Sequence, residues 1–175
     1  MNEGLDIRES IIKSEVVFSK DKKHRYLIKC IWDEDKPKAS IILLNLSSAN
    51  EYKYDNTSMK VINYLVDNRD YGGIYIVNLY SYIETNSDKA TGNIKILGKK
   101  ENDKWIKSAI NNSEKVYIAW GSNDGNKTRI KEVIDILKCN NCKIVYKLLD
   151  KNGDAKHPSI CNIVSEEQID IASIL

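Results

Sequence analysis

The chain has 175 residues, of which 42% are hydrophobic and 30% charged, so it can bury a core as one domain and is not disordered throughout. Its 27 Lys and Arg residues nearly balance 25 Asp and Glu, and the net charge of +2 neither requires nor excludes a polyanionic partner. No apolar run approaches the roughly 18 residues of a membrane span, and the acidic start does not resemble a signal peptide. We therefore expect one cytoplasmic domain over residues 1–175, without membrane contact and with its four cysteines reduced.

Strand patterns come first along the chain. Two early segments rich in β-branched and aromatic residues, 14–19 and 24–32, are expected to pair antiparallel at one edge of a sheet. Continuous short apolar runs follow, the pattern of strands that are covered on both faces. These core runs are 40–46, 73–82, 115–121 and 142–149.

Helical periodicity falls between the core runs and predicts helices over about 56–68, 101–111 and around 130–137. The first has its expected apolar face at Met59, Ile62, Leu65 and Val66. The alternation predicts an α/β fold, a three-layer α/β/α sandwich with a mostly parallel four-stranded core sheet and an N-terminal antiparallel extension. A last short helix is expected from Ser165, where "SEEQ" has capping-box spacing.

Polar residues follow the core runs. Asn45 and Asn78 end the first two, and Trp120, Gly121 and Ser122 end the third. Parallel strands gather their carboxyl ends at one edge, where open α/β sheets bind ligands, so the two amides predict a shared pocket walled by Trp120 and Gly121. The alternative is that each Asn satisfies the backbone of its own loop.

Histidine and cysteine give a weaker signal. His157 stands beside Pro158, which stiffens the chain, and is either a positioned imidazole or an exposed loop residue. His24 precedes a strand without polar neighbours and is expected at the surface. The C-x-x-C spacing of Cys139 and Cys142 lacks a second close pair and ends a helix, so neither a metal site nor a cofactor is expected.

Two groups of lysines could follow a phosphate backbone, or could equally form solvated surfaces. One group surrounds the start of the second helix, and the other flanks His157. They consist of Lys99, Lys100, Lys104 and Lys107, and of Lys147, Lys151 and Lys156.

An ordered set of motifs resembles the domain-of-unknown-function 1643 family of bacteria and phages over about residues 26–159. The motifs are "HRYLIKCIW", "SIILLNLSSAN", "DNTSMKVINYL", "YGGIYIVNLYSY", "GKKENDKWI", "VYIAWGSN" and "GDAKHPS". Leu46 stands where the family's Asn-Pro-Ser motif has its proline, and Asn56 stands where its Asp-Pro-Thr motif has its proline. The polar residues of the two motifs are kept, namely Asn45, Ser47, Asp55 and Thr57.

The loop motifs are also similar to those of the uracil-DNA glycosylase superfamily, whose fold is a three-layer α/β/α sandwich. The resemblance implies that Asn45 orients water and that His157 stabilises charge on a departing base. It also implies that Asn78 binds the edge of that base. The other residues assigned to the base pocket are Ser47, Trp120, Gly121, Ser122 and Ser159.

This chain departs from the glycosylases in two motifs. The Asp-Pro-Tyr of the uracil branch has no counterpart, and Ile160 follows Ser159 where that branch has a second proline. The favoured hypothesis is recognition of a nucleobase or nucleotide, free or in nucleic acid, without catalysis. An active N-glycosidic hydrolase and a protein-interaction scaffold remain alternatives, and the oligomeric state is open.

Overall fold

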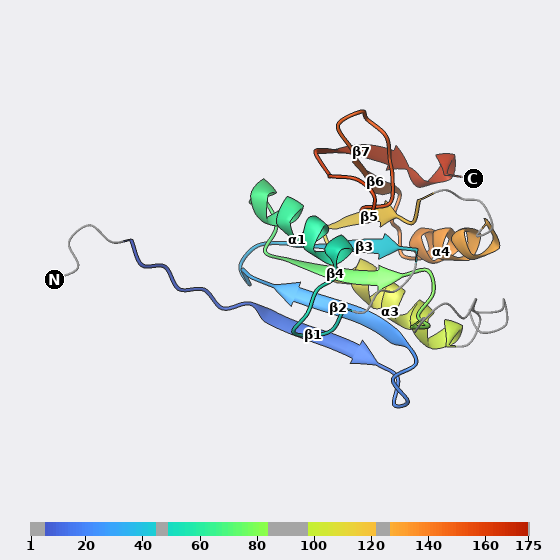
Figure 1. Ribbon diagram of the computed structural model, residues 1–175. Coiled ribbons are helices and arrows are strands. Elements are labelled where there is room, and N and C mark those ends of the chain that lie inside the picture. The colour runs from blue at the N-terminus through green and yellow to red at the C-terminus, as the bar shows by residue number, and fades with distance from the viewer. Residues whose placement is uncertain (1–5, 45–48, 84–97, 122–126, 175) are drawn as a thin grey trace.

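The computed structural model describes residues 6–44, 49–83, 98–121 and 127–174. A seven-stranded sheet runs through its centre in the order β1-β2-β4-β3-β5-β6-β7 (Figure 1). The strands are β1 (Lys13–Phe18), β2 (Arg25–Ile31), β3 (Lys38–Leu43), β4 (Gly73–Asn78), β5 (Lys115–Ala119), β6 (Ile144–Leu149) and β7 (Ser165–Asp170).

The sheet is mixed. Strands β4, β3, β5 and β6 run parallel to one another, whereas β1 and β2 pair antiparallel, and β2 also pairs antiparallel with β4, so the two strands extend the sheet from β4. The expected four-stranded parallel core and N-terminal antiparallel extension are confirmed. The prediction of a helix from Ser165 is wrong, because this segment pairs antiparallel with β6 as the edge strand β7. A single turn of 3-10 helix, η1 (Ile171–Ser173), follows it.

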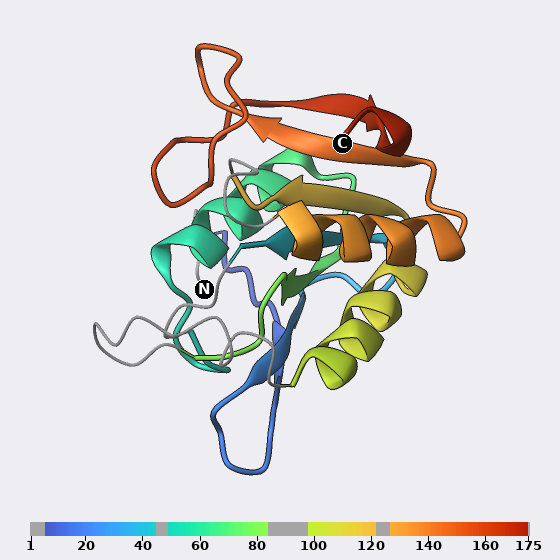
Figure 2. The ribbon, with the colours of Figure 1, turned by 90° about the vertical axis from the view of Figure 1, so that its right-hand side faces the viewer.

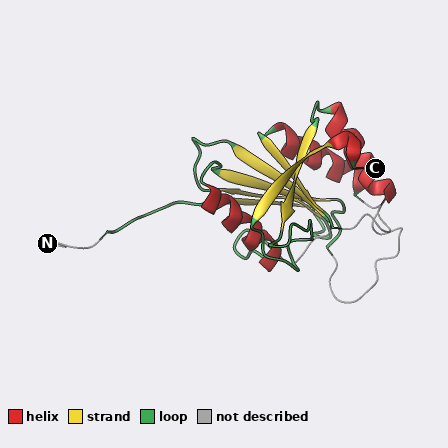
Figure 3. Ribbon diagram, turned by 90° about the horizontal axis from the view of Figure 1, so that it is seen from above, coloured by secondary structure: helices red, strands yellow, loops and turns green. Residues whose placement is uncertain are grey.

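Helices cover both faces of the sheet (Figures 2 and 3). They are α1 (Asn56–Asn68), α3 (Lys99–Asn111) and α4 (Lys127–Cys139). The connection from β3 to β4 moves along the sheet in one direction, and those from β4 to β5 and from β5 to β6 move in the other. Because crossovers between parallel strands are right-handed, α1 lies on one face and α3 and α4 lie on the opposite face.

Alternating strand residues form one apolar core on each face. In β3, Ile41 and Leu43 pack toward α1, while Ile42 packs toward α3 and α4. Full burial of such a side chain stabilises the fold by about 1.5–3 kcal/mol. None of the helices within the described ranges is long and apolar enough to cross a membrane.

Local signals set the limits of α1 where the periodicity predicts them. The Asp55 carboxylate accepts a hydrogen bond from the backbone N–H of Ser58 at 2.6 Å and caps the first turn. Arg69, with a φ of 64°, ends the helix in a left-handed conformation. The buried face is displaced from the expected one, since Met59 and Val66 are each 44% exposed.

Candidate ligand-binding site

The carboxyl ends of β4, β3 and β5 form the part of the sheet best placed to bind a ligand. The helix that follows β3 covers one face, and the helices that follow its neighbours β4 and β5 cover the other. Open α/β sheets bind their ligands where adjacent connections leave toward opposite faces in this way. The side chains at these strand ends therefore define the candidate site.

Asn78, the last residue of β4, is 2% exposed. Strand alternation places it on the α1 face, after Ile74 and Ile76. Its side-chain oxygen Oδ1 is buried and accepts no hydrogen bond from any residue that the structure describes. An unpaired buried acceptor costs about 1–3 kcal/mol. Among the described residues this amide oxygen is therefore a buried acceptor whose hydrogen-bonding capacity is unused.

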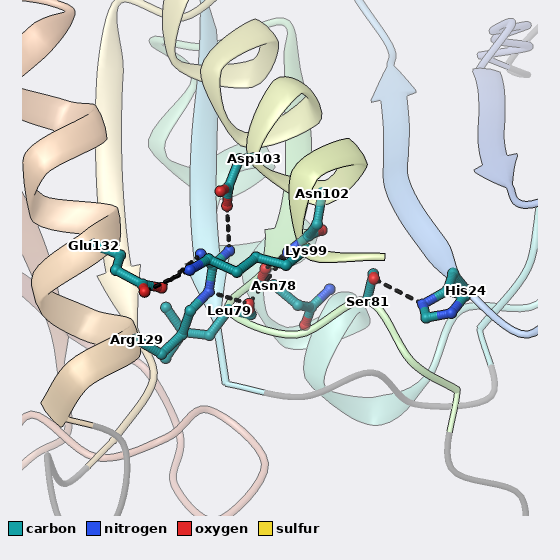
Figure 4. A network of polar contacts seen from close by, with 9 residues as sticks. All are labelled: His24, Asn78, Leu79, Ser81, Lys99, Asn102, Asp103, Arg129 and Glu132. Atoms are coloured by element: carbon teal, nitrogen blue, oxygen red, sulfur yellow. Dashed lines mark hydrogen bonds and ion pairs between the residues drawn. The ribbon is translucent and has the colours of Figure 1, made fainter. Parts of the chain in front are cut away.

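The backbone that carries Asn78 is held from the α3 side (Figure 4). The side-chain Nδ2 of Asn102 donates to the carbonyl oxygens of Asn78 and Leu79, at 3.0 Å and 3.2 Å. Arg129 of α4 also donates, from Nε to the carbonyl of Leu79 at 2.7 Å. Two helices thus fix the end of β4 through hydrogen bonds to its main chain.

Arg129 is itself buried and belongs to an ionic network (Figure 4). Its guanidinium forms ion pairs with Asp103 of α3 at 2.6 Å and with Glu132 at 3.3 Å. Lys99 pairs with the other oxygen of Glu132 at 2.5 Å. Burial raises the pKa of Glu132, but hydrogen bonds from Lys99 and Arg129 lower it by more. The network joins the first turns of α3 and α4 beside Asn78.

His157 lies in the loop that follows β6 and is half-buried. The backbone N–H of Ser159 donates to its Nδ1 at 3.2 Å, and the Ser159 hydroxyl lies 2.8 Å from the same atom. With Nδ1 accepting, the neutral ring carries its proton on Nε2. Burial lowers the pKa of His157, which the charge of Asp55 partly offsets. At neutral pH the residue therefore presents a neutral N–H donor.

Contacts with α1 and β5 hold the His157 loop at the carboxyl edge. Lys60 of α1 donates to the carbonyl oxygens of Pro158 and Cys161, at 3.1 Å and 2.8 Å. Gly121 follows β5 with a φ of 80°, and a Cβ placed on it would lie 3.7 Å from Cβ of His157. The loop therefore connects the start of α1 to the end of β5.

A buried cation lies on the α1 side of the same edge. Arg25, at the start of β2, is 3% exposed and donates from Nη1 to the carbonyl of Ala49 at 2.5 Å. Burial lowers the pKa of Arg25 to about 10, and the charge of Asp55 opposes this effect. Asp55 thus favours the charged forms of both Arg25 and His157, so this carboxylate lies between two cationic or ionisable groups.

A pocket of ≈ 260 Å³ opens at the ends of β5 and β6. We call it the Trp120 pocket; Trp120, Gly121, Lys147, Lys156, Ser173 and Ile174 are among its lining residues. Trp120 and Gly121 thus form the wall of a pocket. In the described part of the chain, however, neither Asn78 nor His157 is among the residues that line it.

The remaining expected site residues divide into two groups. Ser159 is exposed and contacts His157. Asn45, Ser47 and Ser122 lie outside the described residues. The structure therefore brings His157, Ser159 and Gly121 together, and places Asn78 at the same edge of the sheet.

Two expectations about histidine and cysteine can be compared with the structure. The surface position expected for His24 is wrong, because this residue is 9% exposed and its Nδ1 lies 2.9 Å from the hydroxyl of Ser81. Cys139 is an exposed thiol at the end of α4, and Cys142 is a partly exposed one. No group of three or more His, Cys, Asp or Glu in the described segments could hold a metal ion.

Sequence reasoning missed three residues that shape this edge, namely Arg25, Asn102 and Arg129. Each is a polar or charged residue that is 5% exposed or less as a whole residue. Arg129 carried a usable signal, since it directly precedes Ile130 on the apolar side of a helix. A cation at such a position needs a carboxylate partner, which predicts a network without naming its members.

The strand order and the edge define an open α/β domain with a mixed sheet. A family model described as "Protein of unknown function (DUF1643)" matches residues 25–159, which is more than half of the chain. The chain belongs to this family, and the matched region extends from Arg25 of β2 to Ser159 beside His157. No match was found among curated proteins or among solved structures.

Proposed function

We propose that the protein recognises a nucleobase, in a nucleotide or in nucleic acid, at the carboxyl edge of β4, β3 and β5. In this proposal the sheet and its helices form a three-layer arrangement like that of the uracil-DNA glycosylases. The observation that carries the proposal is the Asn78 amide, which is buried at this edge with an Oδ1 that no described residue pairs.

An amide suits a base edge because it offers one acceptor and two donors in one plane. Bases removed from a stack are read by such hydrogen bonds together with stacking. Here Asn102 and Arg129 fix the main chain at Asn78 and Leu79, so the backbone that carries the amide is positioned before a ligand arrives. Orientation in advance reduces the entropy lost on binding.

An active N-glycosidic hydrolase is the second candidate, and His157 favours it. Its pKa is lowered and its Nδ1 accepts hydrogen bonds, which leaves Nε2–H as a neutral donor at neutral pH. A departing base develops negative charge, and a fixed donor stabilises that charge in the transition state. Under the glycosylase resemblance, Asn45 would orient the attacking water.

The lysines at α3 give the proposal less support than the sequence implied. Lys99 is paired with Glu132, and Lys104 with Glu101 at 2.7 Å. Their charges are therefore partly compensated by carboxylates, and a diffuse phosphate-binding surface there is not part of the proposal.

The test combines retardation and cleavage of oligonucleotides that contain uracil, hypoxanthine or a mismatch. Retardation that is lost in Asn78→Ala, without strand breaks after alkali, supports recognition alone. Breaks that require both Asn78 and His157 support the hydrolase. The matched control is Asn63→Ala, an exposed amide on α1 that should change neither result. If the protein caused neither retardation nor strand breaks, the protein-interaction scaffold would be favoured instead.

A further inference from the structure

The Trp120 pocket is a second feature of the carboxyl edge, separate from Asn78. Its volume of ≈ 260 Å³ is below the range of about 300–1,000 Å³ typical for sites that enclose drug-sized ligands. A small group could fill it, but a whole nucleotide could not. The pocket opens beside the His157 loop, because Lys156 lines it and Gly121 lies next to His157.

Lys147 gives the pocket an ammonium group that pairs with no residue in the described part of the chain. Its neighbours Val145 and Leu148 belong to the cores of opposite faces, so strand alternation places Lys147 on the α3 and α4 side of β6. The residue is half-buried, and no described residue accepts a hydrogen bond from it or lies within ion-pair distance. Partial burial of an unpaired charge is unfavourable unless an anion approaches it.

The other lysine of the pocket is compensated. Lys156 lies 2.9 Å from a carboxylate oxygen of Asp150 and 2.9 Å from one of Asp154. These two contacts hold its ammonium at the rim of the pocket and satisfy its charge. Lys147 is therefore the lining residue whose charge remains available to a ligand.

Apolar residues of the same face lie beside Lys147. Ile118 and Ile174 are among the lining residues of the pocket, and Trp120, which also lines it, is 3% exposed. Charges attract more strongly beside such a surface than in water, because the effective dielectric constant is lower. A small anion with several oxygens would gain more here than at an exposed lysine.

From this geometry we infer that the Trp120 pocket binds a phosphate group, with Lys147 as its principal cationic contact. The inference rests on the proposed function and deepens it. The recognised base would belong to a molecule that carries a phosphate, rather than to a free base or nucleoside. Both a free nucleotide and a nucleic-acid backbone carry such a phosphate, and the experiment separates these two sources.

The experiment follows the indole N–H resonance of Trp120 by NMR during titration. The probes are inorganic phosphate, deoxyuridine, deoxyuridine monophosphate and a short uracil-containing oligonucleotide. Phosphate and the monophosphate should shift this resonance, and deoxyuridine should not. The monophosphate should bind at least roughly tenfold more tightly than the nucleoside, since a charge-assisted contact is added. Stronger binding of the oligonucleotide would identify the nucleic-acid backbone as the source.

Variants separate the pocket from a general basic surface. Lys147→Gln should remove the response to inorganic phosphate, whereas Lys151→Gln, an exposed lysine in the loop after β6, should leave it within about twofold. Lys147→Arg should restore the response and thereby exclude a folding defect. A Trp120 resonance that no phosphate-containing probe shifts would overturn the inference, whatever the base titrations show. Phosphate binding at Trp120 without any effect of nucleosides on Asn78 would support the pocket and contradict base recognition.

Discussion

Asn102, in the first turn of α3, donates its side-chain amide to the main-chain carbonyl of Asn78, the last residue of β4, across 3.0 Å. The same Nδ2 lies 3.2 Å from the carbonyl of Leu79. Strand β4 ends here, so its carbonyls lack a continuing ladder and are satisfied by a helix side chain instead. A residue of α3 thereby sets the backbone position of the amide that we propose to read a base.

Asn102→Ala should lower the free energy of unfolding by about 1–3 kcal/mol, because it removes the side-chain donor to the buried carbonyl of Asn78. The carbonyl of Leu79 should still be satisfied in this variant, since Arg129 continues to donate to it. Urea unfolding measures the change, with Asn63→Ala expected within about 0.5 kcal/mol of the parent protein. Equal stability of the two variants would mean that Asn102 does not hold the end of β4.

Elements built from local periodicity could be predicted from the sequence. Helix α4 is the clearest case, since Ile130, Val133, Ile134 and Leu137 recur at helical spacing and are all 0% exposed. The parallel core was also predictable, because continuous apolar runs alternate with such helices. These signals lie within one segment and need no distant partner.

The segment from Ser165 shows where local signals fail. Its capping-box spacing favours a helix, but the free edge of β6 offers a full ladder of backbone partners. Glu166 then pairs with Lys115, which is 51 residues away. The polar partners His24 and Ser81 are 57 residues apart, so a single sequence gave no reason to join them. The parts of the site that could not be predicted likewise depend on contacts between residues that are far apart in the sequence.

Gly98→Ala should destabilise the protein through both strain and contact. Gly98 has a φ of 75°, and a Cβ would approach Nδ1 of the buried His24 to 2.8 Å. The left-handed conformation alone costs an ordinary residue roughly 1–2 kcal/mol. Gly153→Ala is the matched control, with a φ of 80° and no atom within 4 Å of its Cβ. Thermal unfolding should show a larger loss for Gly98→Ala, and equal losses would rule out tight packing on His24.

Glu166 should make stability depend on pH in the acidic range. Burial raises its pKa, but hydrogen bonds from Lys115 and Tyr117 lower it by more, to below the ordinary value of 4.5. A lowered carboxyl pKa contributes stability that is present above the ordinary value and is lost as the pH falls through the folded value. Glu166→Gln should therefore flatten the fall of unfolding free energy below about pH 4.5.

Chemical denaturation between pH 2 and pH 7 would measure this effect of Glu166. Glu167→Gln, an exposed neighbour on β7, serves as the control and should keep the parent profile. If Glu166→Gln retained the same slope, the contacts with Lys115 and Tyr117 would not persist in solution.

Asp55→Asn should lower the pKa of His157 further. Burial already lowers this pKa, and the Asp55 charge is the effect that opposes it. Asparagine caps helices about as well as aspartate, so the hydrogen bond to Ser58 should survive. The chain has only two histidines, which makes the NMR titration of each ring simple to assign. Asp67→Asn, which changes an exposed residue of α1, is the control. An unchanged His157 titration in Asp55→Asn would mean that the Asp55 charge does not act on the pKa of His157.

The central claim is that the buried Asn78 amide binds the edge of a nucleobase. Its most direct test is an NMR titration with deoxyuridine, deoxyinosine and the four common deoxynucleosides that follows the side-chain Nδ2 resonances of Asn78. We predict a saturable shift for at least one of these nucleosides, no shift at the exposed amide of Asn63, and loss of binding in Asn78→Ala with the fold intact. Asn78 resonances that respond to none of them, or an affinity that Asn78→Ala leaves unchanged, would contradict the account.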